Sequence, residues 1–225
     1  MKHFPARSFR DDRAFTLVEM LVVIAIIGIL AGILLPVLAG MQTRAKIMQA
    51  KTEMKNLEAA IKGYEGEYQR MPASKPAEVA AGAAPDLDFT FGTFSLVDGQ
   101  GNAFPTAVLT GKGYEANNSE VMRIIMDRNA GPNTDSARNP RHHVFFTAKE
   151  AKTDRSSGIS AKDDVFRDPW GNPYLITLDL NYDNKCDVGI PFGSVPGSVA
   201  VRSLGPDGVD WNGVGKKYGD DIVSW

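Results

Sequence analysis

The amino-acid sequence predicts an α+β fold, in which one long N-terminal helix precedes a small domain built on an antiparallel β-sheet. Three observations support this prediction. No charged residue occurs between Met20 and Met41. Beyond Met41, apolar and small side chains recur at steps of three and four residues, which is the period of one helix face. The C-terminal third alternates turn clusters with short segments of strand-forming residues, as antiparallel sheets do.

Residues 15–41 are predicted to form a transmembrane helix. A helix rises about 1.5 Å per residue, so this segment is long enough to span the apolar core of a bilayer, which is about 30 Å thick. Its one carboxylate, Glu19, stands close to the start. Because an acid costs about 2.5–3.5 kcal/mol at the membrane centre and less near an interface, such a group is by default functional. The alternative is that Glu19 lies at the headgroup level of an ordinary anchor.

Small residues and a proline follow one another at intervals of four in this helix, at Gly28, Gly32, Pro36 and Gly40. Small residues at this spacing let neighbouring membrane helices approach closely. Pro36 also removes a backbone donor and can kink or locally melt the helix. We expect these residues to allow close packing in an assembly; the alternative is that they reflect the general frequency of Gly and Pro in membrane helices.

Residues 42–71 are predicted to continue the helix as an amphipathic spine. Met71 ends it, because the residue before Pro72 disfavours the helical conformation. We expect one face to pack on a globular head; a coiled coil is the alternative, with only about four turns in which to form. The apolar or small side chains of that face are Ile47, Ala50, Met54, Leu57, Ile61, Tyr64 and Tyr68.

The head, residues 72–225, is predicted to begin with a surface connection. The segment Ala73–Pro85 is rich in alanine and proline, which is typical of a loop. Asn118 begins a polar run that is expected to cap a short helix, Val121–Arg128. Val144–Phe146 is predicted to be a strand.

Composition and spacing give no sign of catalysis. His142 and His143 precede the predicted strand, and adjacent side chains of a strand point to opposite faces, so the two cannot easily share a metal. The Ser, His and Asp residues lack the spacing of a nucleophilic triad, and no phosphate-binding glycine loop occurs. The single cysteine, Cys186, excludes an intrachain disulfide. The net charge of −2 gives no basis for binding nucleic acid by bulk electrostatics.

The C-terminal third is predicted to be strand and loop. The turn cluster Asp168–Tyr174 leads into a strand, Leu175–Leu178, and the alternating segment Ser198–Ser203 should pair with that strand. The acidic run Asp179–Asp187 has the odd-position spacing of a calcium loop but lacks the glycine and terminal Glu of an EF-hand. A hairpin turn between strands is therefore favoured over a metal loop for this run.

The N-terminus combines a short basic leader with a specific sequence. Residues 1–14 carry four basic side chains, Phe15–Glu19 reads Phe-Thr-Leu-Val-Glu, and Pro36 follows in the apolar segment. These features resemble the N-terminal segment of the type IV pilin and type II secretion pseudopilin superfamily. In that family a membrane peptidase cuts before the Phe and methylates the new amine, which implies cleavage between Ala14 and Phe15. The family usually has Gly before the cut. A secretory signal peptide, the alternative, would be cut after the apolar run.

Two C-terminal blocks and the end of the chain, Asp168–Tyr174, Ser203–Gly208 and Asp221–Trp225, are similar to blocks of the major pseudopilin of type II secretion. In that family the loop between the last two blocks binds calcium through acidic side chains and backbone carbonyls. Calcium takes six to eight hard oxygen ligands, which clustered Asp and a Gly-rich backbone can supply. The alternative is that the acidic pair near the end of this loop is a solvated turn. The resemblance implies carboxylate ligands from Asp207, Asp220 and Asp221, and a carbonyl ligand from Leu204.

The resemblance implies a structural subunit that assembles into a helical filament. Glu19 would then neutralise the Phe15 amine of a neighbouring subunit, because two charges in apolar surroundings lower their desolvation cost only when they pair. The expected filament is a type II secretion pseudopilus for protein export, and a type IV pilus for adhesion, motility or DNA uptake is the sister alternative.

The expected partners are further copies of the chain, the prepilin peptidase and the assembly machinery of the bacterial inner membrane. No nucleic-acid partner is expected. The basic leader places the N-terminus in the cytoplasm and the head in the periplasm. A membrane-anchored binding protein or enzyme would need convergent catalytic residues, which the sequence does not display, and would have no use for Glu19.

Overall fold

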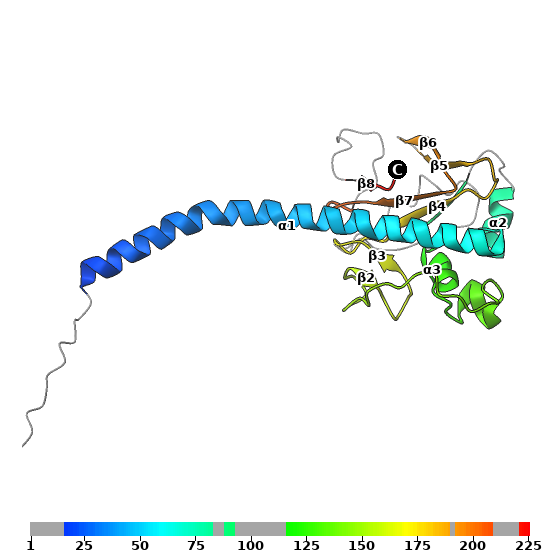
Figure 1. Ribbon diagram of the computed structural model, residues 1–225, viewed down its shortest axis with the longest axis horizontal. Coiled ribbons are helices and arrows are strands. Elements are labelled where there is room, and N and C mark those ends of the chain that lie inside the picture. Colours follow the sequence, from blue (N-terminus) through cyan, green and yellow to red (C-terminus); the bar gives the residue numbers. More distant parts are fainter. Residues whose placement is uncertain (1–15, 83–87, 93–115, 190–191, 209–220) are drawn as a thin grey trace, which may run out of the picture. The chain divides into compact units, whose positions relative to one another are not determined.

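The computed structural model describes residues 16–82, 88–92, 116–189, 192–208 and 221–225, and for residues 35–37, 39 and 189 it describes the backbone alone. The chain divides into two compact units, residues 1–44 and 45–225, and the long helix α1 contributes to both. The elements shown in Figure 1 are α1 (Leu17–Tyr68), α2 (Lys75–Gly82), β1 (Phe89–Phe91), α3 (Ser119–Ile125), the 3-10 helix η1 (Gly131–Ser136), β2 (Gly158–Ile159), β3 (Phe166–Arg167), β4 (Leu175–Leu178), β5 (Lys185–Gly189), β6 (Gly193–Pro196), β7 (Val199–Ser203) and β8 (Ile222–Val223).

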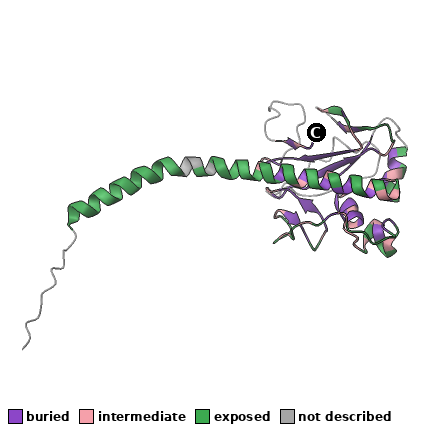
Figure 2. Ribbon diagram, in the orientation of Figure 1, coloured by how far each residue is buried: buried purple, intermediate pink, exposed green. Residues whose placement is uncertain are grey.

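In the first unit, α1 exposes every side chain that the structure describes (Figure 2). Its segment Leu17–Leu34 is long and apolar enough to cross a membrane. The backbone remains helical through Pro36. A helix that is apolar on all sides and has no protein around it is the kind that lipid or neighbouring helices surround.

In the second unit, α1 buries the face that its sequence predicts. The helix ends at Tyr68, and the next residue, Gln69, has a φ of 52°, which is left-handed and closes the helix before Pro72. The fully buried members of the predicted stripe are Ala50, Met54, Leu57, Ile61 and Tyr64, and its two ends, Ile47 and Tyr68, are partly buried against the same core.

The main sheet has four antiparallel strands in the order β1-β4-β7-β8. The predicted pairing of its central strands is confirmed, with Leu175 opposite Arg202 and Leu178 opposite Val199. Two further pairs, β2 with β3 and β5 with β6, form separate two-stranded sheets. All four residues of β4 are buried, which fits its run of Leu, Ile, Thr and Leu.

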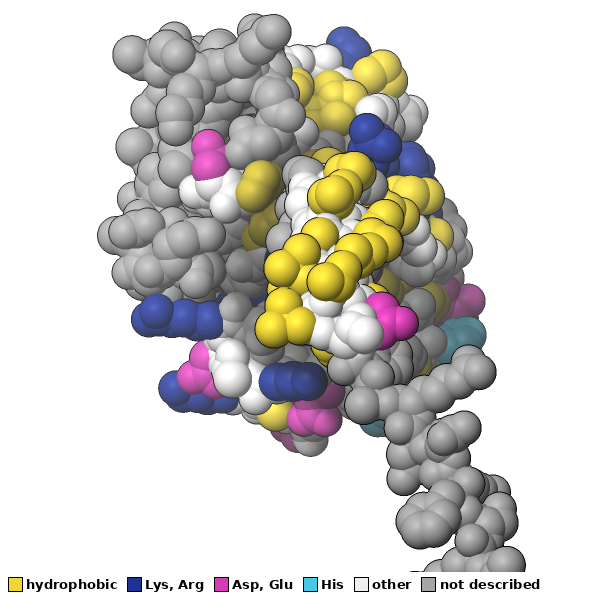
Figure 3. All heavy atoms as spheres, turned by 90° about the vertical axis from the view of Figure 1, so that its left-hand side faces the viewer, with side chains coloured by type: hydrophobic (Ala, Val, Ile, Leu, Met, Phe, Trp, Pro, Cys, Tyr) yellow, Lys and Arg dark blue, Asp and Glu magenta, His cyan; other side chains and the backbone are white. Residues whose placement is uncertain are grey.

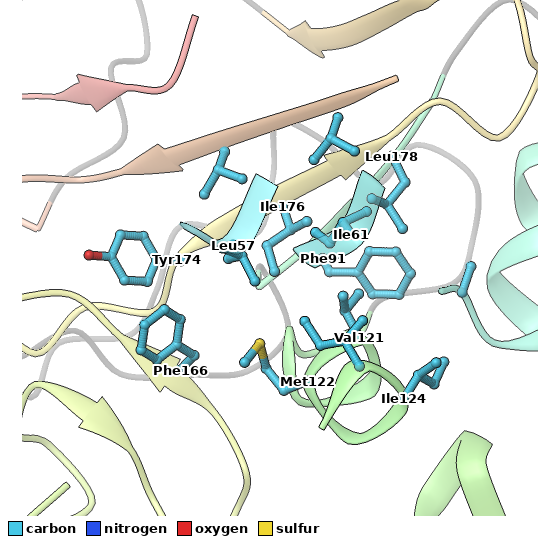
Figure 4. Close-up of a cluster of buried hydrophobic side chains, with 14 of the residues drawn as sticks. Leu57, Ile61, Phe91, Val121, Met122, Ile124, Phe166, Tyr174, Ile176 and Leu178 are labelled. Carbon is cyan, nitrogen blue, oxygen red and sulfur yellow. The ribbon is translucent and has the colours of Figure 1, made fainter. Parts of the chain in front are cut away.

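The core of the head lies between α1, the main sheet and α3. Figure 4 shows Leu57 and Ile61 of α1 beside Ile176 of β4, with Val121 of α3 below them. A fully buried side chain of this size stabilises the fold by about 1.5–3 kcal/mol. Packing against the sheet therefore holds the second half of α1 in the head.

The predicted surface connection at Ala73–Pro85 is wrong, because residues 75–82 form α2. Ser74 caps this helix: the backbone N–H of Ala77 donates to its hydroxyl at 3.3 Å, and the N–H of Glu78 donates to its carbonyl at 3.0 Å. Pro76 falls in the first turn, where no intrahelical donor is needed. The alanines supply helix propensity and a small buried face, Ala77, Ala80 and Ala81.

The predicted cap and length of the next helix are also wrong. The side chain of Asn118 makes no capping hydrogen bond. Its Nδ2 donates to the carbonyls of Phe166 and Tyr174 at 2.8 and 2.9 Å, so it joins α3 to two segments of the sheet region. The helix ends at Ile125 and not at residue 128, because Asp127 has a φ of 53°.

Residues 144–146 do not form the predicted strand. The backbone N–H groups of Phe145 and Phe146 both donate to the carbonyl of Ile125, at 2.8 and 3.2 Å. The segment therefore satisfies the end of α3 and does not join a sheet.

The first part of the acidic run, residues 179–184, is a turn between strands, as predicted, and residues 185–187 belong to β5, but the turn does not close a hairpin. It connects β4 to β5, and β5 pairs with β6 and not with β4. Side-chain oxygens of this turn accept backbone N–H groups: Asp179 accepts from Asp183 and Asn184 at 3.2 and 2.9 Å. These bonds within the turn replace the ladder that a hairpin would form.

Candidate functional site

Glu19 lies at the start of α1 and closes a reciprocal cap with Thr16. The backbone N–H and the hydroxyl of Thr16 donate to Oε2 of Glu19 at 2.9 and 2.7 Å, and the backbone N–H of Glu19 donates to the Thr16 hydroxyl at 3.2 Å. This is a capping box, which satisfies two backbone donors at the helix start. The sequence analysis missed the role of Thr16, although Thr-x-x-Glu before an apolar run is the pattern that signals it.

The apolar segment that follows Glu19 offers a continuous surface for lipid or for other helices. Hydrophobic side chains gather on the part of α1 that faces the viewer in Figure 3. Among the glycines of the predicted small-residue row, a Cβ added at Gly28, Gly32 or Gly40 would meet no atom of the described chain within 4 Å. The side chain of Pro36 lies outside the described residues, so its part in this row stays a prediction.

Two carboxylates of α1 fasten the helix to the head. The Tyr174 hydroxyl donates to Glu53 at 2.6 Å, and the Ser198 hydroxyl donates to Glu65 at 2.9 Å. Burial, reinforced by the Glu53 carboxylate, raises the pKa of Tyr174 above its ordinary value, so the phenol stays protonated and remains a donor. Sequence periodicity gives no signal for these contacts, because both carboxylates lie beside the apolar stripe and look like solvated charges.

The residues predicted to bind calcium lie at the two ends of the segment that follows β7. Leu204 is fully buried and Asp207 is partly exposed. Ser203 pairs with Ile222 in the β7–β8 ladder, and this register brings Leu204 and Asp221 to the same end of the two strands. Asp220 lies outside the described residues. The structure therefore brings together two of the four predicted ligand residues and leaves the complete set a prediction.

Arg202 is a neighbour of the predicted metal ligands that the sequence analysis missed. Its Nη1 lies 3.9 Å from Oδ2 of Asp221, and both side chains are buried, with exposed fractions of 4% and 6%. Its guanidinium also lies over the ring of Phe192, 5.6 Å from the centroid. A guanidinium therefore lies next to one of the three predicted carboxylate ligands.

A buried hydrogen-bond network links the Asp168–Tyr174 turn to the same segment. Oδ2 of Asp168 accepts from the Ser203 hydroxyl at 2.6 Å, and Oδ1 accepts from the backbone N–H groups of Trp170 and Asn172 at 2.9 Å each. Nδ2 of Asn172 donates to the carbonyl of Gly205 at 2.7 Å. The turn thus holds the end of β7 and the first residues after it in place.

Burial raises the pKa of Asp168 to about 6, and hydrogen bonds from Ser203 and nearby backbone groups oppose this increase only in part. The pKa of Asp88, which lies beside the 179–187 segment, is shifted in the same direction. Burial raises its pKa to about 6, its backbone hydrogen bonds oppose the increase, and the charges of Asp179 and Asp187 add to it. Both carboxyls are therefore sensitive to mild acid.

The two adjacent histidines are both exposed. Nδ1 of His142 lies 3.0 Å from Asp127 and 3.3 Å from the Ser136 hydroxyl. Because both partners contact the same ring nitrogen, the group does not have the relay geometry of a nucleophilic triad. His143 packs on Phe145, with ring centroids 4.8 Å apart.

The predicted processing site, Ala14 and Phe15, lies outside the described residues. Comparison with known families bears on this part of the chain: residues 9–35 match the prokaryotic N-terminal methylation motif. The chain has a prepilin-type N-terminus. This segment contains Thr16 and Glu19 and most of the apolar helix, so the match coincides with the capped start of α1.

Individual proteins of two kinds are similar to this prepilin-type chain. The type IV major pilin protein PilA of Myxococcus xanthus is 46% identical over 59 residues, which cover 26% of this chain and 27% of that protein. The type II secretion system core protein G of Pectobacterium carotovorum is 36% identical over 64 residues, which cover 28% of this chain and 41% of that protein. The type II secretion system core protein G of Klebsiella pneumoniae is 33% identical over 77 residues, which cover 34% of this chain and 55% of that protein.

The likeness covers a limited part of each protein. The chain spans about a quarter to just over half of the length of these relatives. No solved structure matches the chain. The comparisons therefore bear on a limited part of the chain, and the head is described by its own structure.

Proposed function

We propose that this protein is a structural subunit that assembles into a type II secretion pseudopilus and so drives protein export. The observation that carries the proposal is the start of α1. A carboxylate, Glu19, stands at the head of an exposed, membrane-length apolar helix inside a prepilin methylation motif. In a single membrane anchor, a charge at this position gains no partner that would offset its desolvation cost. In a bundle of such helices, the carboxylate can pair with the amine of a neighbouring subunit.

In the proposed assembly, cleavage after Ala14 exposes the amine of Phe15, and Glu19 of one subunit neutralises the amine of the next. The capping box holds the Glu19 side chain at the helix start and leaves Oε1 without a hydrogen bond from any described residue. At Gly28, Gly32 and Gly40 an added Cβ would meet no described atom within 4 Å, and the lack of a side chain there allows neighbouring helices to approach.

Secretion is favoured over a pilus for adhesion, motility or DNA uptake by the C-terminal half of the chain. The Asp168 turn is hydrogen-bonded to the segment after β7, where calcium is proposed to bind. The relatives include both core protein G of secretion systems and pilins, so a pilus subunit remains the second candidate.

Calcium is part of the proposal. Asp207, Asp221 and the carbonyl of Leu204 would hold it, with Asp220 from the undescribed segment; all are oxygen donors of the kind that calcium prefers. The ion would supply positive charge to these carboxylates, one of which, Asp221, lies 3.9 Å from Nη1 of Arg202.

The proposed partners are further copies of the chain, the prepilin peptidase and the inner-membrane assembly machinery, with the head in the periplasm. The role is structural and not enzymatic. Its relatives are named as filament and secretion-system proteins, and His142 with its neighbours lacks triad geometry.

Two substitutions separate charge pairing from helix capping. Glu19→Gln keeps an oxygen for the capping box but removes the charge, and Thr16→Ala breaks the box but keeps the charge. Leaving the amine of a neighbour unpaired in apolar surroundings costs about 3–5 kcal/mol, roughly a hundredfold or more for each subunit added. We expect filament yield to collapse in Glu19→Gln and to persist in Thr16→Ala.

The measurement is the amount of chain in sheared filament fractions, with the amount in membrane fractions as the control for insertion. Equal membrane levels of wild type and both variants are expected. Normal filaments from Glu19→Gln, with loss in Thr16→Ala, would show that the residue acts as a helix cap and would remove the main support for the proposed function.

A further inference from the structure

A groove of about 530 Å³ lies in the head between α2, α3, η1 and the segment just beyond α1, and the proposed filament function makes no use of it. One wall is formed by Arg70, just beyond α1, and by Lys75 at the start of α2. Arg123 of α3 and the start of η1 form another wall. In Figure 1, α2 lies at the end of the head where α1 finishes.

Two cations of this groove have no carboxylate partner among the described residues. Nη2 of Arg70 donates to the carbonyls of Ala137 and Arg138, at 3.4 and 2.9 Å, so backbone groups fix its position without neutralising it. Lys75 is exposed and forms no ion pair with any residue that the structure describes. Because α2 begins at Lys75, the positive end of that helix adds to the local potential.

Arg123 is held rigidly at the opposite wall. Its Nε donates to Oδ2 of Asp164 at 2.8 Å, and Arg128 donates to the other oxygen of the same carboxylate at 2.5 Å. One carboxylate is thus shared by two guanidinium groups. Nη1 of Arg123 lies beside Gly131, where an added Cβ would come within 2.9 Å of it, so the glycine leaves room for the guanidinium.

The groove therefore carries a surplus of positive charge in a chain whose net charge is −2. Arg138 is buried and paired with Glu78, and Glu120 also lines the wall. Five cationic groups meet three carboxylates in and behind the groove, which leaves two positive charges unbalanced. These groups are Arg70, Lys75, Arg123, Arg128 and Arg138, against Glu78, Glu120 and Asp164.

We propose that this groove binds a small organic anion through its carboxylate. Guanidinium groups fixed by other contacts are suited to carboxylates, because they offer forked N–H donors in a set geometry. Carbon surfaces of Pro76, Pro132 and Ala137 line the same groove and would contact an apolar body attached to the carboxylate. A cavity of this size, with apolar walls and a few fixed polar groups, is typical of a small-molecule site.

The test uses the full chain in detergent micelles and ligand-observed NMR titration with three probes: benzoate, its uncharged analogue benzamide, and inorganic phosphate. Benzoate is expected to bind saturably, and benzamide is not expected to bind. Phosphate is expected to bind at least about tenfold more weakly than benzoate, because it cannot use the carbon walls.

Three variants locate the binding. Arg70→Gln combined with Lys75→Gln removes the two unpaired charges, and Ala137→Phe fills the groove from an exposed position without changing charge. Both are expected to weaken benzoate binding at least about tenfold. Lys51→Gln, which alters an exposed lysine of α1 outside the groove, is the matched control and should bind benzoate as wild type does.

Unchanged melting temperatures would show that all variants fold. Absence of saturable benzoate binding, or equal binding in wild type and Ala137→Phe, would overturn the proposal. Phosphate binding as tight as benzoate binding would overturn the assignment of a carboxylate with an apolar body. Filament assembly is not part of the readout, so the proposal stands or falls independently of the proposed function.

Discussion

Asp168 connects the Asp-Pro-Trp-Gly turn to the end of β7 through the hydroxyl of Ser203. Burial raises the pKa of this carboxyl to about 6, above the ordinary value of 3.8. The folded protein therefore binds the proton more tightly than the unfolded chain. The resulting contribution to stability is present in full below pH 3.8 and is lost as the pH rises through about 6.

Replacing Asp168 by Asn tests this pH dependence. Asn resembles the protonated carboxyl: its oxygen can accept from Trp170 and Asn172, and its amide can donate to Ser203. Between pH 7.5 and 5, the free energy of unfolding of wild type should rise relative to Asp168→Asn by about 1.4 kcal/mol.

Denaturant unfolding of the full chain in detergent at the two pH values measures this difference. Asp154→Asn, at a carboxylate that is half exposed, is the control. The difference in unfolding free energy between wild type and this variant should not change comparably between the two pH values. A difference between wild type and Asp168→Asn that does not vary with pH would mean that the carboxyl does not titrate in this range.

At the scale of elements, α1 is one helix in two environments. In the first unit the apolar side chains that the structure describes are exposed, and in the second unit one stripe packs into the core of the head. Substitutions in the two halves should therefore affect different properties: filament assembly in the first half and folding of the head in the second.

Leu57→Ala is expected to destabilise the head by about 2–5 kcal/mol, because Leu57 is fully buried between α1 and the sheet (Figure 4). The midpoint of denaturant unfolding measures the loss. Lys51→Ala, an exposed site on the same helix, should change stability by no more than about 0.5 kcal/mol. Equal effects of the two substitutions would mean that α1 does not pack on the sheet through this face.

The N-terminal segment makes a separate prediction about processing. We expect cleavage between Ala14 and Phe15, with methylation of the new amine, since residues 9–35 match the methylation motif. Mass spectrometry of the chain from its native membrane should find Phe15 as the first residue. Ala14→Phe should leave the precursor uncut, while Ala14→Gly should be cut at least as well. A mature chain that begins near Met41 would instead indicate a secretory signal peptide.

At the scale of the whole molecule, the sheet is closed at one edge by β8, which follows the proposed calcium loop. Without a bound ion, we expect Asp207, Asp220 and Asp221 to repel one another across that loop, and Arg202, which lies beside Asp221, to offset only part of the repulsion. Loss of the ion is therefore expected to loosen the end of the chain and its pairing with β7.

Calcium should raise the melting temperature of the full chain in detergent relative to chelator. At free calcium a hundredfold above Kd, the added stability is about 2.7 kcal/mol. Asp207→Ala should remove most of this increase and make the segment after Ser203 sensitive to protease. Asp154→Ala, a carboxylate outside the loop, is the control and should keep the full increase. An unchanged melting temperature of wild type in chelator would remove calcium from the proposal.

The predictions from sequence that the structure confirms depend on local pattern. The stripe of α1 repeats over many turns, and five of its seven members are fully buried while the two end members, Ile47 and Tyr68, are partly buried. The strands at 175–178 and 199–203 are short, but turn clusters bound them, and they pair as expected. The predictions that were wrong have both local and distant causes: Ser74 caps α2 from the neighbouring residue, whereas other segments bind residues far along the chain. Asn118 reads as a helix cap in the sequence, yet its side chain binds Phe166 and Tyr174.

The sequence by itself determined the membrane-length helix, the position of Glu19 at its start and the buried face of its second half, because periodicity and charge placement are properties of neighbouring residues. Only the tertiary structure decided that Arg202 lies beside Asp221, that Asp168 binds Ser203, and that the cations Arg70, Lys75, Arg123 and Arg138 line one groove. Such groupings arise from contacts between residues tens of positions apart, and no local pattern records which distant partner a buried polar group will find.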